Sequence, residues 1–323
     1  MNNISDIRIK IGNFYKKNDA ELLATLAGIL TFILVYGYKV LNPLNISWMY
    51  NGFSSDFTQH YLGWKGFRSS AWTFPVGLMD QLTYPYRVSI IYTDSIPVFA
   101  LFFKIFSPIL PGRFQYFGLW GLLTYAINGF MASKILKRYM NSLINTVLGS
   151  MFFIFSFQML ERMYFHSALA AHWMILLAIY LILIRRELSI RKKVLGWGVI
   201  GLLCPLIHSY FILFDGVILF GFMLAVIIDK DGPEKGIKKR VLAAGISFAG
   251  FVVSGLLMLY LLGAFYGGFA ALKGSVESFG LDLNAFFNEM GAGYFPEIFS
   301  YRKGHRIYYL GAGMIILTVL TLI

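Results

Sequence analysis

Residues 194–228 read VLGWGVIGLLCPLIHSYFILFDGVILFGFMLAVII, a run of 35 residues with one charged side chain, Asp215. As a single helix this run would extend about 52 Å, because each residue adds about 1.5 Å. The hydrocarbon core of a membrane is only about 30 Å thick. Pro205, just before the polar residues 208–210, is the natural break. The run therefore predicts two membrane-crossing helices joined by a tight turn.

The composition of the whole chain agrees with this prediction. Of its 323 residues, 58% are hydrophobic and only 14% are charged, against about 25% charged residues in an average soluble domain. Such a composition excludes a soluble domain and a disordered chain, and the single cysteine, Cys204, excludes a disulfide scaffold. The chain is predicted to be an all-α polytopic membrane protein. In a membrane protein, a net charge of +12 is interpreted by the side of the membrane on which the basic residues lie. No nucleic-acid partner is expected.

Further apolar runs are long enough to cross. The first, Leu22–Leu41, has no small-residue cleavage site, so it is expected to stay as an anchor and not to be removed as a signal peptide. A last run, 307–323, reaches the chain end without polar flanks, which indicates a chain truncated at its C-terminus. The other expected spans are Tyr116–Ser133, Leu143–Leu160, Ser167–Ile184 and Val241–Leu262.

The run Val88–Gly112 is ambiguous, and the distribution of basic residues decides its interpretation. If this run does not cross, 17 Lys and Arg residues fall on the inner side and 10 on the outer side, with Lys39 inside the first span. If it crosses, two basic clusters move outside, against the positive-inside rule. We therefore expect a proline-broken interfacial or re-entrant helix, about eight spans and a cytoplasmic N-terminus. The predicted single domain, 1–323, carries a first outer loop at 42–115 and a last outer loop at 264–306.

Long loops on a helical scaffold often carry function, and the first outer loop contains an acid and a histidine at helical spacing. Asp56, His60 and Gly63 fall on one face of the helix predicted to begin near Ser55, with Gln59 beside them. Asp56 and His60 could act as a base and its partner, or as two metal ligands. The alternative is an N-capping aspartate and an interfacial histidine.

Two later segments supply further candidates. Asp94 lies close to an apolar run, so it either needs a polar partner or caps the helix that begins near Ser95. Glu161, His166 and His172 follow the third span and offer ligand types for a divalent ion, although Glu161 could simply pair with its neighbour. All five histidines lie at or near the outer side, which packing alone does not readily explain. Five aromatic residues form an interfacial belt or a sugar-binding platform: Trp72, Phe74, Tyr84, Tyr86 and Tyr92.

The last outer loop ends in a cationic cluster formed by Arg302, Lys303 and Arg306. These side chains either hold a lipid phosphate or anchor the adjoining span at the interface. Their position on the side where few basic residues are expected favours the phosphate.

Several motifs together resemble a bacterial family of GT-C-like membrane proteins, a superfamily of integral-membrane glycosyltransferases. The resemblance covers most of the chain, and its first-loop motifs are fairly specific. The motifs are Ser55-Asp56…Gln59-His60-Tyr61-Leu62-Gly63-Trp64, Trp72-Thr73-Phe74-Pro75, Tyr92-Thr93-Asp94-Ser95-Ile96-Pro97, Gln115-Tyr116-Phe117-Gly118-Leu119-Trp120 and Ala171-His172-Trp173.

The resemblance implies a GT-C-like helical bundle that transfers a sugar from a polyprenyl-phosphate-linked donor to a glycan, lipid or protein acceptor outside the membrane. It implies catalytic roles for Asp56 and Glu161, to which the helical spacing adds His60. The expected ligands of a divalent ion, Mg²⁺ or Mn²⁺, are Asp56, Glu161 and His166. Glu161 is a lone acid where many relatives carry a pair, which leaves the metal dependence open. The expected substrate-binding residues are Gln59, Trp64, Arg68, Tyr92, Asp94, His172, Arg302, Lys303 and Arg306.

Two other functions compete with this one. A transporter or flippase for a lipid-linked glycan should carry polar residues at mid-membrane on several helices. The spans hold little beyond Asp215, Asn128 and Asn145, which favours chemistry at the outer face. A non-catalytic assembly subunit with the same fold is the third possibility.

Overall fold

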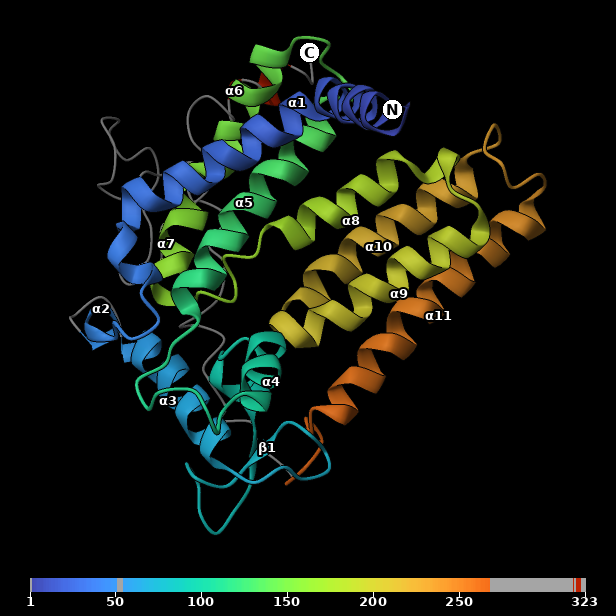
Figure 1. Ribbon diagram of the computed structural model, residues 1–323. Coiled ribbons are helices and arrows are strands. Elements are labelled where there is room, and N and C mark those ends of the chain that lie inside the picture. Colours follow the sequence, from blue (N-terminus) through green and yellow to red (C-terminus); the bar gives the residue numbers. More distant parts are fainter. Residues whose placement is uncertain (1, 51–54, 268–315, 317, 321–323) are drawn as a thin grey trace. The chain divides into compact units, whose positions relative to one another are not determined.

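Figure 1 shows the computed structural model, which describes residues 2–50, 55–267, 316 and 318–320. The chain separates into two compact units, Met1–Gly267 and Gly268–Ile323. Most of the second unit lies outside the described residues, including the expected last loop from residue 268 onward. The single-domain organisation therefore stays a prediction, and the architecture below is that of the first unit.

Helices α1 (Asn2–Tyr36) and α5 (Phe117–Leu136) pack along each other. The backbone of α1 leaves helical geometry at Asn18, with φ −119° and ψ 17°, so α1 consists of two helices joined at that residue. Gly28 and Gly129 lie where a Cβ atom would overlap a carbonyl oxygen of the facing helix. Small residues at such contacts let two backbones approach closely, as in many membrane helix pairs.

The next helical segment of the unit is broken into two helices. Helices α6 (Leu143–Ile154) and α7 (Phe157–Phe165) follow one another with a bend of 50°. The chain then returns through α8 (Trp173–Leu183) and the short 3₁₀ helix η3 (Arg185–Glu187).

The run 194–228 is two helices, as the sequence predicts. Helix α9 (Ile190–Ile207) contains Pro205 in its last turn, and α10 (Phe211–Ile228) begins four residues after α9 ends. Helix α11 (Ile237–Leu261) packs closely along α9, because a Cβ atom on Gly201 would overlap the carbonyl oxygen of Phe251.

The first long loop is folded into short elements between α1 and α5. The loop gathers at one end of the unit, below the long helices in Figure 1. We call it the α3 end, after its longest helix. Its elements are η1 (Tyr38–Leu41), α2 (Ser47–Tyr50), α3 (Ser55–Ser69), β1 (Leu78–Met79), β2 (Val88–Ser89), η2 (Ile90–Thr93) and α4 (Pro97–Ile105), with β1 and β2 antiparallel.

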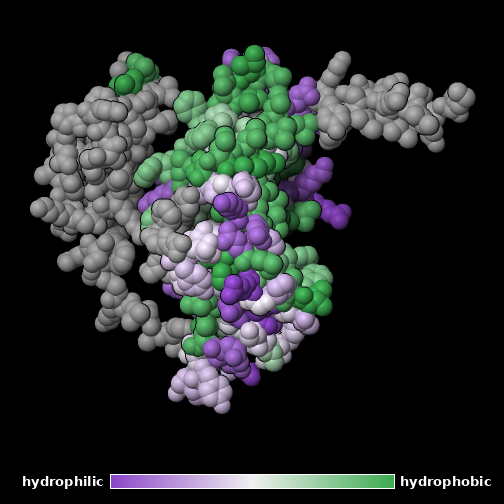
Figure 2. Space-filling view, turned by 60° about the vertical axis from the view of Figure 1, so that its left-hand side comes forward, coloured by the Kyte–Doolittle hydropathy of each residue, from purple (hydrophilic) through white to green (hydrophobic). Residues whose placement is uncertain are grey.

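Three of the described helices are long and apolar enough to cross a membrane: Asn18–Tyr36 of α1, α10 and α11. The bent pair of α6 and α7 makes a fourth if it counts as one span. Helix α4, with nine residues or about 14 Å, is too short to cross. In Figure 2, hydrophobic residues cover much of the upper part of the face shown, and hydrophilic residues gather lower down. The protein is therefore a largely helical membrane protein, and the count of about eight spans stays a prediction.

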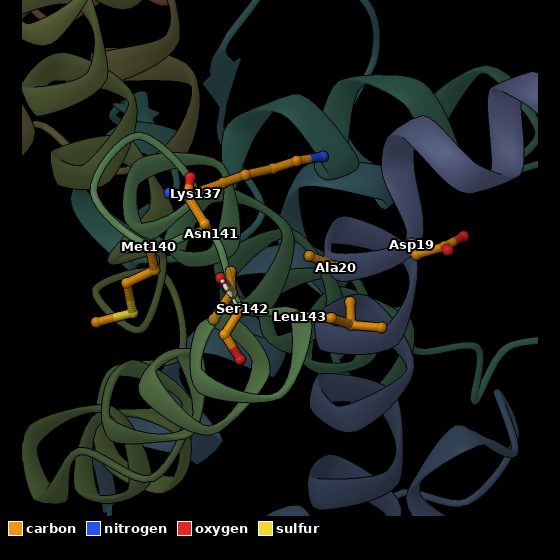
Figure 3. A pocket seen from close by; sticks show the side chains of 8 residues that line it. Asp19, Ala20, Lys137, Met140, Asn141, Ser142 and Leu143 are labelled. Atoms are coloured by element: carbon orange, nitrogen blue, oxygen red, sulfur yellow. Dashed lines mark hydrogen bonds between the residues drawn. The ribbon is translucent and has the colours of Figure 1, made fainter.

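Ion pairs hold together the chain segments at the end opposite α3. They join α1, just after its break at Asn18, to the end of α5, the end of α5 to η3, η3 to the end of α10, and α9 to the loop before α11. The pairs are Lys137–Glu21, Arg138–Glu187, Arg186–Asp229 and Lys193–Glu234. A cavity of about 450 Å³, which includes solvent at its mouth, lies at this end between α1 and the connection from α5 to α6 (Figure 3).

Lys104 of α4 is a buried cation at the α3 end. Its side chain is 3% exposed, and its Nζ atom lies 3.9 Å from the ring centre of Phe67 and 4.6 Å from that of Trp72. Within the described residues this Nζ has no hydrogen-bond partner. Burial lowers the pKa of Lys104 to about 8, and Asp80 opposes this by raising it.

Replacement of Lys104 by Met should therefore change how stability depends on pH. Between pH 8 and pH 10.5, the ordinary pKa of lysine, the unfolded chain binds more protons than the folded chain. The stability of the wild-type protein should consequently rise with pH across this window. The Lys104→Met variant should lose that rise, as measured by unfolding temperature in detergent from pH 7 to pH 10.5. Parallel curves for the two proteins would contradict this assignment.

Candidate functional site

A cluster of three histidines and two aspartates lies at the α3 end, built from four separate segments of the chain. Asp56 and His60 come from α3, and Asp94 follows η2. His166 ends α7, and His208 ends α9. The cluster therefore exists only when the first loop folds against the ends of α7 and α9.

Helix α3 approaches the segment 93–95 closely because Gly63 has no side chain. A Cβ atom at this position would overlap the side chains of Thr93 and Ser95. The Ser95 hydroxyl donates to the His60 carbonyl oxygen at 2.6 Å, and the Tyr116 hydroxyl donates to the Ser95 carbonyl oxygen. These contacts fix the segment on which Asp94 lies.

Asp94 is the centre of the cluster. Its Oδ2 atom lies 3.6 Å from both His60 Nε2 and His166 Nδ1, and its Oδ1 atom lies 2.9 Å from His208 Nε2. The backbone of Asp94 is left-handed, with φ 52°, and so is that of Ile96, with φ 54°. Non-glycine residues adopt this conformation at an energetic cost that is most often seen at functional sites.

The Asp94 carboxyl is ionised. Burial raises its pKa, but the contacts with His166, His208 and His60 lower it more, so that the pKa lies well below the usual range of a carboxyl group. The centre of the cluster is therefore a carboxylate surrounded by three imidazoles, and it can accept hydrogen bonds or bind a cation.

His208 has a defined tautomer. Its Nδ1 atom accepts a hydrogen bond from the backbone N–H of Tyr210 at 3.1 Å. The proton of a neutral ring must then lie on Nε2, which donates to Asp94. His208 thus uses both ring nitrogens to hold the carboxylate in place.

Asp56 lies at the accessible side of the cluster. Its Oδ2 atom is 3.6 Å from His166 Nε2, and its side chain is 41% exposed. His166 therefore lies between Asp94, whose side chain is 24% exposed, and the more exposed Asp56. In this arrangement Asp56 can exchange protons with a molecule outside the cluster, and the imidazole of His166 lies next to it on the inner side.

The structure brings together four of the residues that the sequence singles out: Asp56, His60, Asp94 and His166. The common face of Asp56, His60 and Gly63 on α3 is confirmed, since each of them contacts the cluster or its supporting segment. The suggestion that Asp94 caps a helix near Ser95 is wrong, because α4 begins at Pro97 and its N-cap residue is Ile96.

Other predicted residues lie elsewhere. Glu161 is half-buried on α7, and among the described residues it does not belong to the group formed by His60, Asp94 and His166. His172 precedes α8 and Gln59 is exposed on α3, again outside the cluster. Their predicted roles stay untested. Arg302, Lys303 and Arg306 lie outside the described residues.

Three further predicted substrate-binding residues make contacts that support the fold. Trp64 is fully buried, and its indole N–H donates to the Phe114 carbonyl oxygen at 3.0 Å. The Arg68 guanidinium donates to three carbonyl oxygens near the end of α4. The Tyr92 hydroxyl donates to the Ala264 carbonyl oxygen at 2.6 Å.

His208 is the member of the cluster to which sequence reasoning assigned no role. It follows α9, more than a hundred residues after Asp94, and no local spacing connects the two. The only signal in the sequence was the gathering of histidines at one side of the predicted membrane.

These features define a helical membrane protein with a histidine–aspartate centre at one end of its helices. The family model for the domain of unknown function DUF6311 matches residues 25–323. Since the match covers most of the chain, the protein belongs to this family. No curated protein and no solved structure matched the chain.

Proposed function

We propose that this protein is a multi-pass membrane glycosyltransferase of the GT-C type with its reaction centre at the outer face. The donor would be a sugar linked to polyprenyl phosphate, and the acceptor a glycan, lipid or protein. The expected arrangement has about eight spans, a cytoplasmic N-terminus and the α3 end outside.

In this proposal Asp56 is the catalytic base. Its carboxylate takes the proton of an acceptor hydroxyl while the acceptor oxygen forms a bond to the anomeric carbon of the sugar. The bond from that carbon to the phosphate oxygen breaks, and polyprenyl phosphate leaves with inversion at the carbon. A divalent ion near the site would supply stabilisation of the charge on the departing phosphate.

The position of Asp56 is the observation that supports this proposal best. It is a half-exposed carboxylate in the first long loop, next to a residue from the loop after the third long helical segment, His166. The GT-C resemblance places reacting carboxylates in these two loops, although here the residue from the second loop is a histidine and not Glu161. Apolar helices beside the site suit a donor with a long hydrocarbon chain.

The test is a transfer assay with the full-length protein in proteoliposomes. A panel of short-chain polyprenyl-phosphate sugars, each labelled in the sugar, is added outside, and released polyprenyl phosphate is measured together with labelled acceptor. Release with at least one donor is expected. Movement of labelled lipid across the bilayer without cleavage would instead identify a flippase, and neither activity would favour an assembly subunit.

The proposed orientation makes a prediction about two sites at opposite ends of the first unit. Arg113 belongs to the segment that Arg68 holds against α3, whereas Asn141 lines the cavity at the other end (Figure 3). After Cys204 is replaced by Ala, a cysteine at 113 should react with an impermeant maleimide in intact cells. A cysteine at 141 should react only after permeabilisation, and the reverse pattern would contradict the proposed orientation.

A further inference from the structure

We infer that His60, Asp94 and His166 bind one divalent transition-metal ion, of the zinc class, and that His208 positions the carboxylate ligand. This inference rests on the geometry of the cluster and does not depend on the glycosyl-transfer proposal. It also names a ligand set different from the Asp56, Glu161 and His166 set that the sequence suggests.

The spacing of the side chains suits a metal ion better than hydrogen bonds. Each residue offers one ligand atom, and these three atoms lie within 4.8 Å of one another. The 3.6 Å separations from Asp94 Oδ2 to His60 Nε2 and His166 Nδ1 are too long for hydrogen bonds. A tetrahedral ion held at about 2.1 Å by its ligands would place them roughly 3.4 Å apart. The observed separations are therefore close to those of a metal polyhedron.

The imidazoles also lack the partners that a buried polar ring normally has. His60 is 1% exposed, and within the described residues its Nδ1 atom has no hydrogen bond. The same holds for Nδ1 of His166, the atom that faces Asp94 Oδ2. A buried polar atom without a partner destabilises the fold, and a metal bond at His166 Nδ1 would remove that cost.

His208 has the features of a positioning residue. Its Nε2–H donates to Asp94 Oδ1, the oxygen that does not face the other two histidines. Its Nδ1 lone pair is already used by Tyr210, so His208 has no free nitrogen with which to bind the ion. Hydrogen bonds of this kind orient metal-bound carboxylates and typically contribute about 10–100-fold in affinity.

The donor set indicates the class of ion. Two imidazoles and one carboxylate suit Zn²⁺, Co²⁺, Fe²⁺ and Mn²⁺, whereas Mg²⁺ prefers oxygen ligands and keeps much of its water. Asp56 lies 3.6 Å from Nε2 of His166, the ring nitrogen that does not face Asp94, so it would contact the metal-binding imidazole from the side away from the ion.

The experiment measures metal binding in the full-length protein, purified in detergent without a polyhistidine tag and stripped with a chelator. Zn²⁺, Co²⁺ and Mg²⁺ are titrated separately, with metal content after gel filtration and the visible spectrum of the Co²⁺ form as readouts. One Zn²⁺ per chain and a tetrahedral Co²⁺ spectrum are expected. Mg²⁺ should compete poorly. Absence of stoichiometric Zn²⁺ binding, or preference for Mg²⁺, would overturn the inference.

Variants then identify the ligands. His60→Ala, His166→Gln and Asp94→Asn should each weaken Zn²⁺ binding more than 100-fold, and His208→Phe should weaken it about 10–100-fold. Asp80→Asn, in the same loop but outside the cluster, should bind as the wild type does. Glu161→Gln should also bind normally. Loss of binding in Glu161→Gln together with full binding in His60→Ala and His166→Gln would assign the metal to the other ligand set. Because binding is measured without substrate, these results stand apart from any outcome of the transfer assay.

Discussion

Replacement of Asp56 by Asn should reduce turnover about 10²–10⁴-fold, which corresponds to about 3–5 kcal/mol of activation free energy. Asn has nearly the same size and can begin a helix as well as Asp, but its amide cannot accept a proton as a base. Asp56 lies in the first turn of α3 with 41% of its side chain exposed. The expected defect is therefore in the reaction and not in the fold.

The measurement is turnover per folded molecule in the transfer assay, with unfolding temperature as the check on folding. Lys65→Gln is the matched control, since Lys65 is exposed on the same helix and belongs to no proposed site. Normal turnover by Asp56→Asn would remove Asp56 from the reaction. A lowered unfolding temperature with unchanged turnover would make it a structural residue.

Replacement of Gly63 by Val should disrupt the cluster without touching any of its members. The added side chain would overlap Thr93 and Ser95, so the segment that carries Asp94 must move away from His60. Displacements of about 1 Å in a reaction centre can cost about 10²-fold in rate. We expect a loss of at least that size in turnover, with a parallel loss of bound Zn²⁺.

Gly216→Val is the control for this variant. Gly216 lies in α10, and an added Cβ atom there meets no described atom within 4 Å. It should keep both turnover and metal content. Normal metal binding by Gly63→Val would show that α3 and the segment 93–95 need not approach as closely as the structure has them.

Much of the helical architecture could be predicted from the sequence because membrane helices depend on length and apolarity. The break near Pro205 and the failure of the run 88–112 to form one long helix follow from prolines and charge. The bend between α6 and α7 and the shortness of α8 were not predicted. An apolar run does not show where its backbone leaves helical geometry, because the same residues would fit a straight helix.

Part of the candidate site could also be predicted from the sequence, and part of it could not. Asp56, His60 and Gly63 could be placed together because helical spacing is a local property. The position of Asp94 at the centre depends on the left-handed backbone at residues 94 and 96, and that of His208 on how α9 packs. The position of Asp94 and the position of His208 therefore cannot be predicted from the local spacing of residues. Glu161 resembled a ligand by residue type and loop, but the turn at the end of α7 brings His166 to the cluster instead.

The proposed glycosyl transfer is tested most directly by mass spectrometry of cell-envelope glycans from cells that lack this gene. One glycan should lose the mass of a single sugar residue, and the wild-type gene should restore it. The Asp56→Asn gene, expressed at the same level in the membrane, should not restore it. An unchanged set of glycans in the deleted cells, or full restoration by Asp56→Asn, would contradict the proposal.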